Sequence, residues 1–147
     1  MNLEPAITLI KRFEGFRAKP YLCPAGIPTI GYGATFYEDG SKVKLTDPAI
    51  TEPRAVELLM HMLHTQFIPG LIRQCPILLW DELKFNAILD FSYNLGLGNL
   101  QVSTLKKKIN AADWSAAKVE LRKWTRGGGK ELPGLVLRRE AEIKLFN

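Results

Sequence analysis

The chain has 147 residues, 46% of them hydrophobic and 24% charged, a composition ordinary for a globular protein and a length that supports one core rather than two independent ones. No stretch approaches the roughly 18 uninterrupted apolar residues of a membrane-spanning helix, and the N-terminus lacks the form of a secretory signal, because its apolar residues are periodic and Glu4 stands where basic residues belong. The net charge of +5 suits an anionic polymer such as a cell wall, an anionic membrane surface or nucleic acid.

Few residues are available for a metal site or a disulfide framework. Two cysteines, Cys23 and Cys75, are too few for such a framework, and their spacing places them in different parts of the fold, so we expect Cys23 to be a free, solvent-reachable thiol. His61 and His64 lie three residues apart on a helical stretch, but nothing else completes a set of metal ligands. We therefore expect no metal ion and no cofactor.

The first 45 residues predict a helix followed by a small sheet. Apolar residues at helical spacing predict an amphipathic helix over residues 3–13, which Gly15 can end. Residues 16–45 are rich in proline and glycine, which is typical of short strands between turns, and they predict a small antiparallel sheet.

The rest of the chain predicts helices. In chain order, periodicity and capping residues predict helices over 51–67, 81–95, 103–110, 113–124 and 133–146. Pro69-Gly70 is expected to interrupt the chain after the first of these helices, and the three glycines at 127–129 are expected to form a loop.

These elements predict an α+β fold in a single domain, residues 1–147. The strands are confined to one early stretch, and so small a sheet must pack against a helix. We expect a small sheet lobe over about 14–50 and a larger helical lobe over about 1–13 plus 68–147, joined by the helix over 51–67. Such an arrangement would leave a cleft between the lobes for an extended polymer.

The segment 13–33 carries three reactive side chains, Glu14, Cys23 nine residues on and Thr29 six further. Glu14 lies where the first helix meets the sheet. A general acid has to keep its proton at working pH, and partial desolvation by neighbouring aromatic side chains would favour this. The alternative is an ordinary surface carboxylate beside Lys11 and Arg17.

The run Thr29-Ile30-Gly31-Tyr32-Gly33 predicts a strand with two different faces. Ile30 and Tyr32 would share an apolar face directed to the core. The other face would offer the Thr29 hydroxyl and bare glycine backbone, which suits the close approach of a sugar ring or a water held by Thr29. The alternative is a structural threonine beside glycines of a bulge.

The order and spacing of Glu14, Cys23 and Thr29 resemble the catalytic segment of the phage-type lysozymes, glycoside hydrolase family 24, whose pattern is Glu, then Asp or in some members Cys, then Thr. Residues 85–110 and 124–145 resemble two further segments of that family in the same order. The resemblance implies a mostly helical lysozyme-like fold. It also implies a muramidase that cleaves the β-1,4 bond between N-acetylmuramic acid and N-acetylglucosamine.

The resemblance also implies roles for individual residues. Glu14, Cys23 and Thr29 would be catalytic. The substrate-binding residues would be Gly31, Tyr32, Asn94 and Arg139. Asn94 would line the sugar groove, and Arg138 or Arg139 would approach Glu14 from the last helix.

Cys23 stands where most of the family carries an aspartate. Glycosidic cleavage needs an acid for the leaving oxygen and a second group for the water or the sugar cation. A thiolate can serve as that second group, and no carboxylate occurs at positions 18–37. The alternative is an inert cysteine on a catalytically weakened peptidoglycan-binding protein.

The resemblance implies a phage endolysin for host cell lysis whose partners are peptidoglycan glycan strands. We expect a monomer without stable membrane insertion, which waits in the host cytoplasm until a separate membrane-permeabilising protein releases it to the wall in the periplasm. A nucleic-acid binder is disfavoured, because the basic residues form no stripe and no recognised motif is present.

Overall fold

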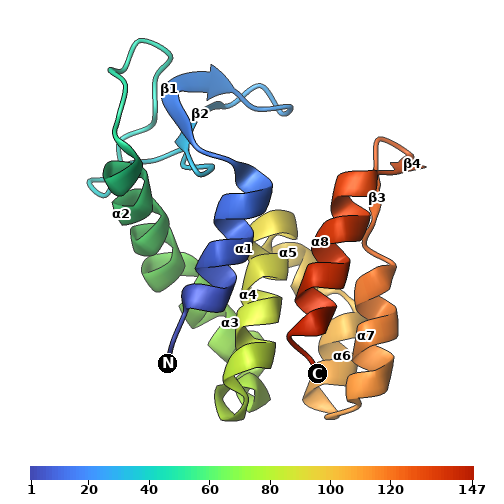
Figure 1. Ribbon diagram of the computed structural model, residues 1–147. Coiled ribbons are helices and arrows are strands. Elements are labelled where there is room, and N and C mark those ends of the chain that lie inside the picture. Colours follow the sequence, from blue (N-terminus) through green and yellow to red (C-terminus); the bar gives the residue numbers. More distant parts are fainter. The chain divides into compact units, whose positions relative to one another are not determined.

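The computed structural model describes residues 1–147 and divides into two compact units (Figure 1). One unit is Glu14–Gln66, and the other comprises Met1–Phe13 and Phe67–Asn147. The smaller unit therefore extends beyond residue 50, because the helix after the sheet region packs on the second strand. The predicted α+β class, mostly helical with small antiparallel sheets, is confirmed.

The smaller unit is built on a two-stranded antiparallel hairpin of β1 (Arg17–Leu22) and β2 (Pro28–Gly31). Two strands are marginal alone, and β2 packs against helix α2 (Glu52–Met62), which Thr51 caps. The Thr51 hydroxyl accepts the backbone N–H of Arg54. One core cluster of this unit consists of Ile30, Ala34, Val43 and Leu58.

The hairpin is irregular in β1. Arg17 pairs with Gly31 and Tyr21 pairs with Thr29, so three residues of β1 lie opposite a single residue of β2. Pro20, which has no N–H to donate to the ladder, falls in this bulge. Bulges bend a strand and redirect its side chains.

The expected interruption at Pro69-Gly70 is wrong. The helical path continues from α2 through the π-helical segment η1 (Leu63–Phe67) into α3 (Ile68–Gln74). Pro69 falls in the first turn of α3, where its missing N–H needs no partner. Gly70 packs so closely on Leu97 that any Cβ there would overlap the leucine side chain.

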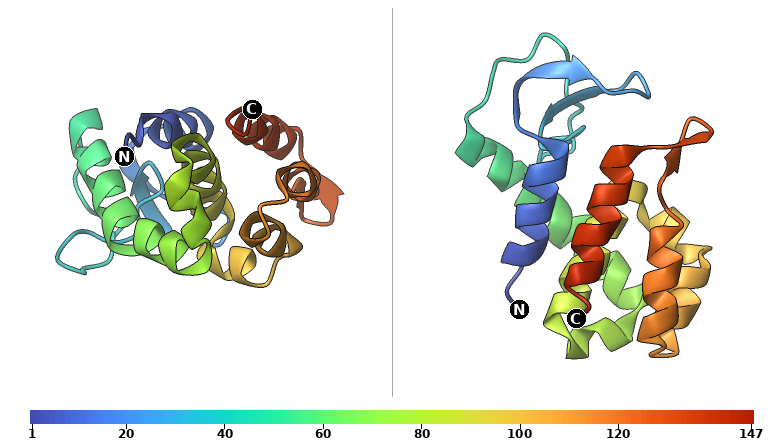
Figure 2. Two further views of the ribbon diagram at one scale, coloured as in Figure 1. Left: turned by 90° about the horizontal axis from the view of Figure 1, so that it is seen from below. Right: turned by 45° about the vertical axis from the view of Figure 1, so that its right-hand side comes forward.

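The larger unit is helical apart from one short hairpin (Figures 1 and 2). Its remaining elements are α1 (Glu4–Glu14, whose last residue begins the smaller unit), η2 (Pro76–Trp80), α4 (Glu82–Leu95), α5 (Leu97–Gln101), α6 (Thr104–Asn110), α7 (Trp114–Arg122), β3 (Arg126–Gly127), β4 (Lys130–Glu131) and α8 (Pro133–Lys144). Side chains of Asp81, Ser103 and Asp113 cap α4, α6 and α7, and the caps at Ser103 and Asp113 were expected from the sequence.

Helix α4 is the centre of the larger unit. Its residues from Phe85 to Ser92 are all buried, and α8, η2, α3 and α5 pack around it. The Asn86 side chain accepts the backbone N–H of Ala6 at 3.0 Å, which fixes α1 to α4. A helix buried on all sides must satisfy its polar side chains internally.

The sequence prediction missed some short elements. The glycines at 127–129 do not form a plain loop but belong to the β3–β4 hairpin, with Gly128 and Gly129 at positive φ. The short helices η2 and α5 were also not expected. None of the helices combines the length and apolar character needed to cross a membrane.

Candidate active site

Glu14 is the last residue of α1 and is half-buried. Gly15 follows at φ 73°, a left-handed conformation that ends the helix at little cost for glycine. Strand β1 begins two residues later at Arg17. This local geometry places the Glu14 carboxyl at the entrance of the hairpin that carries Cys23 and Thr29.

Tyr21 is the residue around which the candidate catalytic groups lie, and it was given no role of its own at the sequence level. It pairs across the hairpin with Thr29. The pKa of Tyr21 is raised, first by burial and then by the negative charges of Glu14 and Cys23, while Arg17 opposes the shift. Both Glu14 and Cys23 therefore act electrostatically on the same hydroxyl.

Cys23 follows β1 at the start of the hairpin turn. Its N–H donates to the Ile27 carbonyl at 3.1 Å, and its carbonyl accepts the N–H of Gly26 at 2.8 Å. The pKa of the thiol is lowered, chiefly by hydrogen bonding from the backbone of Ile27 and less by Ala25 and the Thr29 side chain. The thiol is free and partly exposed, and its lowered pKa favours the reactive thiolate form.

Thr29 is buried, with 3% of its surface exposed. Its hydroxyl donates to the Ile27 carbonyl at 2.8 Å. The same hydroxyl contributes to the lowered pKa of the Cys23 thiol. A hydroxyl has one proton, and here Ile27 receives it. While the proton points to Ile27, the Thr29 oxygen remains an acceptor for a water molecule.

Gly31 does not provide the open backbone expected for a sugar ring. It is buried at φ 69°, and a Cβ added there would lie 3.1 Å from the Cβ of Ala55 on α2. The prediction of a bare substrate floor at this position is wrong, because helix α2 covers that face. Gly31 is needed for its conformation and for the approach of α2.

Tyr32 is largely buried, with 6% of its surface exposed. Its hydroxyl donates to a carboxylate oxygen of Glu52 at 3.3 Å, and its ring centre lies 5.9 Å from that of Phe16. Burial, with Glu52 adding to it, raises the pKa of Tyr32. Only the edge of this side chain is available to a ligand.

In the larger unit, Arg139 is fully buried and cannot touch a substrate directly, which corrects the expected role. Its Nη2 donates to the Asn94 side-chain oxygen at 2.7 Å and to Glu142 at 3.0 Å, and its Nη1 donates to the Trp124 carbonyl at 3.3 Å. Asn94 itself is only half-buried. Arg139 therefore fixes the orientation of the Asn94 amide.

Arg138 is part of a second buried pair. Its Nε and Nη2 donate to the two oxygens of Asp90 at 3.0 and 2.8 Å, a bidentate arrangement. The pKa of Glu142 is raised well above its usual range, first by burial and then by a hydrogen bond with Asp90, with Arg139 opposing. Two arginines and two acids thus form one buried network between α4 and α8.

The comparisons with known proteins agree with this fold. Residues 11–142 match the family model described as Phage lysozyme. The chain is 39% identical over 99% of its length to the endolysin of Bacillus phage B103 and spans 54% of that protein. It is 49% identical over 88% of its length to the SAR-endolysin of Enterobacteria phage PA-2 and spans 74% of that protein. The solved endolysin of Escherichia coli O157:H7 phage FAHEc1 superimposes with a TM-score of 0.83 at 28% identity, covering 99% of this chain and 93% of that one.

The fold and the family match define a lysozyme-like hydrolase. The chain belongs to the phage lysozyme family, as the sequence predicted. This family places it among the endolysins, hydrolases that lyse peptidoglycan.

Proposed function

We propose that the chain hydrolyses the β-1,4 bond between N-acetylmuramic acid and N-acetylglucosamine in peptidoglycan, with Glu14, Cys23 and Thr29 as its catalytic residues. The observation that carries this proposal is that Tyr21 pairs with Thr29 across the hairpin, while Glu14 at the end of α1 and Cys23 in the hairpin turn both act electrostatically on the Tyr21 hydroxyl. An acid, a base and a water-holding hydroxyl are the groups that a glycosidase requires.

In the proposed mechanism the Glu14 carboxyl donates its proton to the leaving glycosidic oxygen. A water molecule donates one hydrogen bond to the Thr29 oxygen, attacks the anomeric carbon and passes its proton to the Cys23 thiolate. The products are a Glu14 carboxylate, a Cys23 thiol and a cleaved strand, and proton transfer back to Glu14 restores the starting state. The lowered thiol pKa supports this role for Cys23, because it enlarges the thiolate fraction near neutral pH.

The stereochemistry of the product distinguishes this mechanism from direct attack by sulfur. A water activated by Cys23 gives inversion at the anomeric carbon, whereas a covalent glycosyl–sulfur intermediate gives retention. Proton NMR of freshly released reducing ends reports the anomer before mutarotation. Inversion is the expected result, and retention would assign Cys23 as the nucleophile instead.

Asn94 is proposed to bind the sugar chain, with Arg139 as a positioning residue. Arg139 holds the Asn94 oxygen, which leaves the NH2 group of the amide available to a sugar oxygen. Tyr32 is proposed as a lesser contact through its exposed edge.

The proposed setting is host cell lysis. The chain would act as a monomer on glycan strands in the periplasm, after a separate membrane-permeabilising protein releases it from the host cytoplasm. The support is that its relatives are named endolysins and SAR-endolysins.

The decisive test is turbidity loss of chloroform-treated Gram-negative cells, together with release of reducing ends from purified peptidoglycan. Replacing the general acid typically removes about 10²–10⁴-fold of rate, so Glu14→Gln should abolish lysis in a protein with an unchanged circular dichroism spectrum. Binding to peptidoglycan without any release of reducing ends by the wild type would instead establish the alternative, a binding protein on the same scaffold.

A further inference from the structure

Two adjoining hollows lie on the larger unit and contain none of the candidate catalytic residues. One has a volume of about 630 Å³ between α5 and α6, and the other about 520 Å³ between α3, α5 and α6. Gln101 and Lys106 line both, so the hollows form one continuous surface, which we name the basic groove.

Three cations and no carboxylates line the basic groove. Lys107 belongs to the first hollow, Arg73 to the second and Lys106 to both. None of the three forms an ion pair, whereas lysines and arginines elsewhere in this unit pair with acids. With no carboxylate in its lining, the groove attracts an anion without any like-charge repulsion.

The basic excess of the whole chain lies in the unit that carries this groove. The larger unit has fifteen basic and nine acidic residues, a net charge of +6, and the smaller unit has five basic and six acidic residues, a net charge of −1. The long-range field of the molecule therefore attracts anions to the helical unit rather than to the hairpin.

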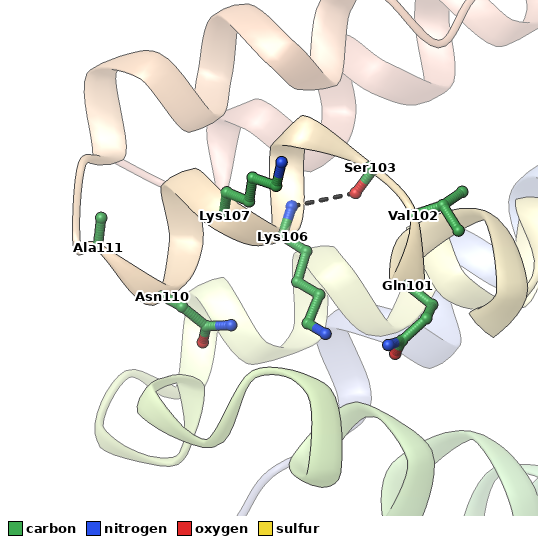
Figure 3. Close-up of a pocket in the computed structure, with 7 residues that line it drawn as sticks. All are labelled: Gln101, Val102, Ser103, Lys106, Lys107, Asn110 and Ala111. Atoms are coloured by element: carbon green, nitrogen blue, oxygen red, sulfur yellow. Dashed lines mark hydrogen bonds between the residues drawn. The ribbon is translucent and has the colours of Figure 1, made fainter.

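Lys106 lines both hollows of the groove. It is half-buried, and its charge acts on the buried Cys75 thiol. In Figure 3 its side chain extends from α6 on the same side as the amides of Gln101 and Asn110. The Asn110 NH2 donates to the Gln74 carbonyl at 2.9 Å. This bond orients the Asn110 amide, whose second N–H remains available to a ligand.

We propose that the basic groove is a second binding site of this protein, one that takes a phosphate group. A phosphate presents several acceptor oxygens, and the groove offers an arginine fork, two lysines and two amide groups as donors. The groove is larger than a single phosphate, so it accommodates a phosphate ester such as a glycerophosphate headgroup. Val102, which is 80% exposed at the rim, adds an apolar contact for the organic part of the ester.

The test compares two variants with equal loss of charge. Arg73→Gln/Lys106→Gln/Lys107→Gln removes the cations of the groove. Lys118→Gln/Lys130→Gln/Lys144→Gln removes three cations of the same unit that pair with no carboxylate and lie outside the groove. Both variants are first checked for unchanged melting temperature.

The first measurement is a titration with glycerol phosphate at constant ionic strength, followed by amide NMR. We expect saturable shifts at Gly70, Gly98 and Ser103, with Gly26 in the other unit unaffected. The groove variant should lose these shifts and the control variant should keep them. Equal shifts with acetate, equal loss in both variants or no saturable shift in the wild type would overturn the proposal.

The second measurement distinguishes the source of the phosphate. Vesicles of phosphatidylglycerol and of phosphatidylcholine are sedimented with each protein. If lipid headgroups are the source, removal of the groove cations should weaken binding to phosphatidylglycerol by at least about tenfold, and the control variant should lose much less. Glycerol phosphate binding without vesicle binding supports the site and assigns it to a soluble or polymer-borne phosphate ester.

Discussion

The guanidinium carbon of Arg17 lies 4.2 Å from the centre of the Tyr21 ring, within the bulged part of β1. This cation–π contact holds the ring against the strand that faces Thr29. The Tyr21 hydroxyl is thereby fixed within electrostatic reach of both Glu14 and Cys23. We infer that Tyr21 is a positioning residue for the proposed acid and base.

Tyr21→Phe keeps the ring and the contact with Arg17 but removes the hydroxyl. We expect lysis to slow by about tenfold, with a changed pH–rate profile and an unchanged melting temperature. Tyr37→Phe is the matched control, because the Tyr37 hydroxyl donates to Asp47 in the same unit at 2.7 Å. The control should lose about 1 kcal/mol of stability and keep the wild-type profile. Identical pH profiles for wild type and Tyr21→Phe would remove Tyr21 from the mechanism.

The two thiols should differ sharply in reactivity. Cys23 is partly exposed with a lowered pKa, whereas burial raises the pKa of Cys75 to about 11, with Lys106 opposing. Iodoacetamide should therefore label Cys23 selectively and stop lysis, as followed by mass spectrometry and turbidity. Labelling of Cys75 at a comparable rate would contradict this structure.

Substitutions at Cys23 test its chemical role. Cys23→Asp should keep or raise activity, because a carboxylate can accept the same proton. Cys23→Ser should lower activity, since a serine hydroxyl is a far weaker base than a thiolate. Full lysis by the serine variant would show that Glu14 and a water held by Thr29 suffice.

The buried network in the larger unit should make stability depend on pH. The pKa of Glu142 in the folded state is raised above its ordinary value of 4.5. The protonated acid therefore stabilises the folded state fully below about pH 4.5, and this stabilisation is lost as the pH rises through the folded-state pKa. Glu142→Gln mimics the protonated acid. We expect the melting temperature of Glu142→Gln, measured relative to that of the wild type, to increase as the pH is raised from about 4.5. A difference that stays constant with pH would refute the raised pKa of Glu142.

Asp90→Asn is the contrasting change in the same network. Asp90 accepts from Arg138 through both oxygens in a buried pair, so its replacement by asparagine removes a carboxylate charge and the bidentate contact from that arginine. The expected loss is about 3–5 kcal/mol of unfolding free energy, measured by urea denaturation. A loss smaller than that of Glu142→Gln would be inconsistent with this pairing.

Gly31→Ala should destabilise the smaller unit in two ways, through the strained left-handed backbone conformation and through a close contact of the new Cβ with α2. Gly26→Ala is the matched control, because Gly26 also has a positive φ, 77°, but no atom lies within 4 Å of the position of an added Cβ. The left-handed conformation costs about 1–2 kcal/mol at either site. The contact with Ala55 on α2 should make the change at Gly31 the larger one, and equal losses would show that α2 does not restrict that position.

The sequence by itself determined the local features of this protein. Gly15 ends the first helix at Glu14, and the side chains of Asp81, Ser103 and Asp113 start three others, because these effects act within a few residues. The spacing of the acid, thiol and hydroxyl, together with the segments 85–110 and 124–145, was also sufficient to predict the family, because each of these motifs is contiguous in the sequence.

Only the tertiary structure decided what each face of these elements contacts. The alternation of TIGYG indicated an open glycine face, but α2 covers Gly31 from a distant part of the sequence. The bulge between Arg17 and Tyr21 interrupts the regular alternation of side chains in β1. The neighbours of Tyr21 therefore could not be inferred from that alternation. Arg139 is charged and would be expected at the surface, yet it is buried and hydrogen-bonded to Asn94 and Glu142. Burial of a charge depends on such partners, which the local sequence does not specify.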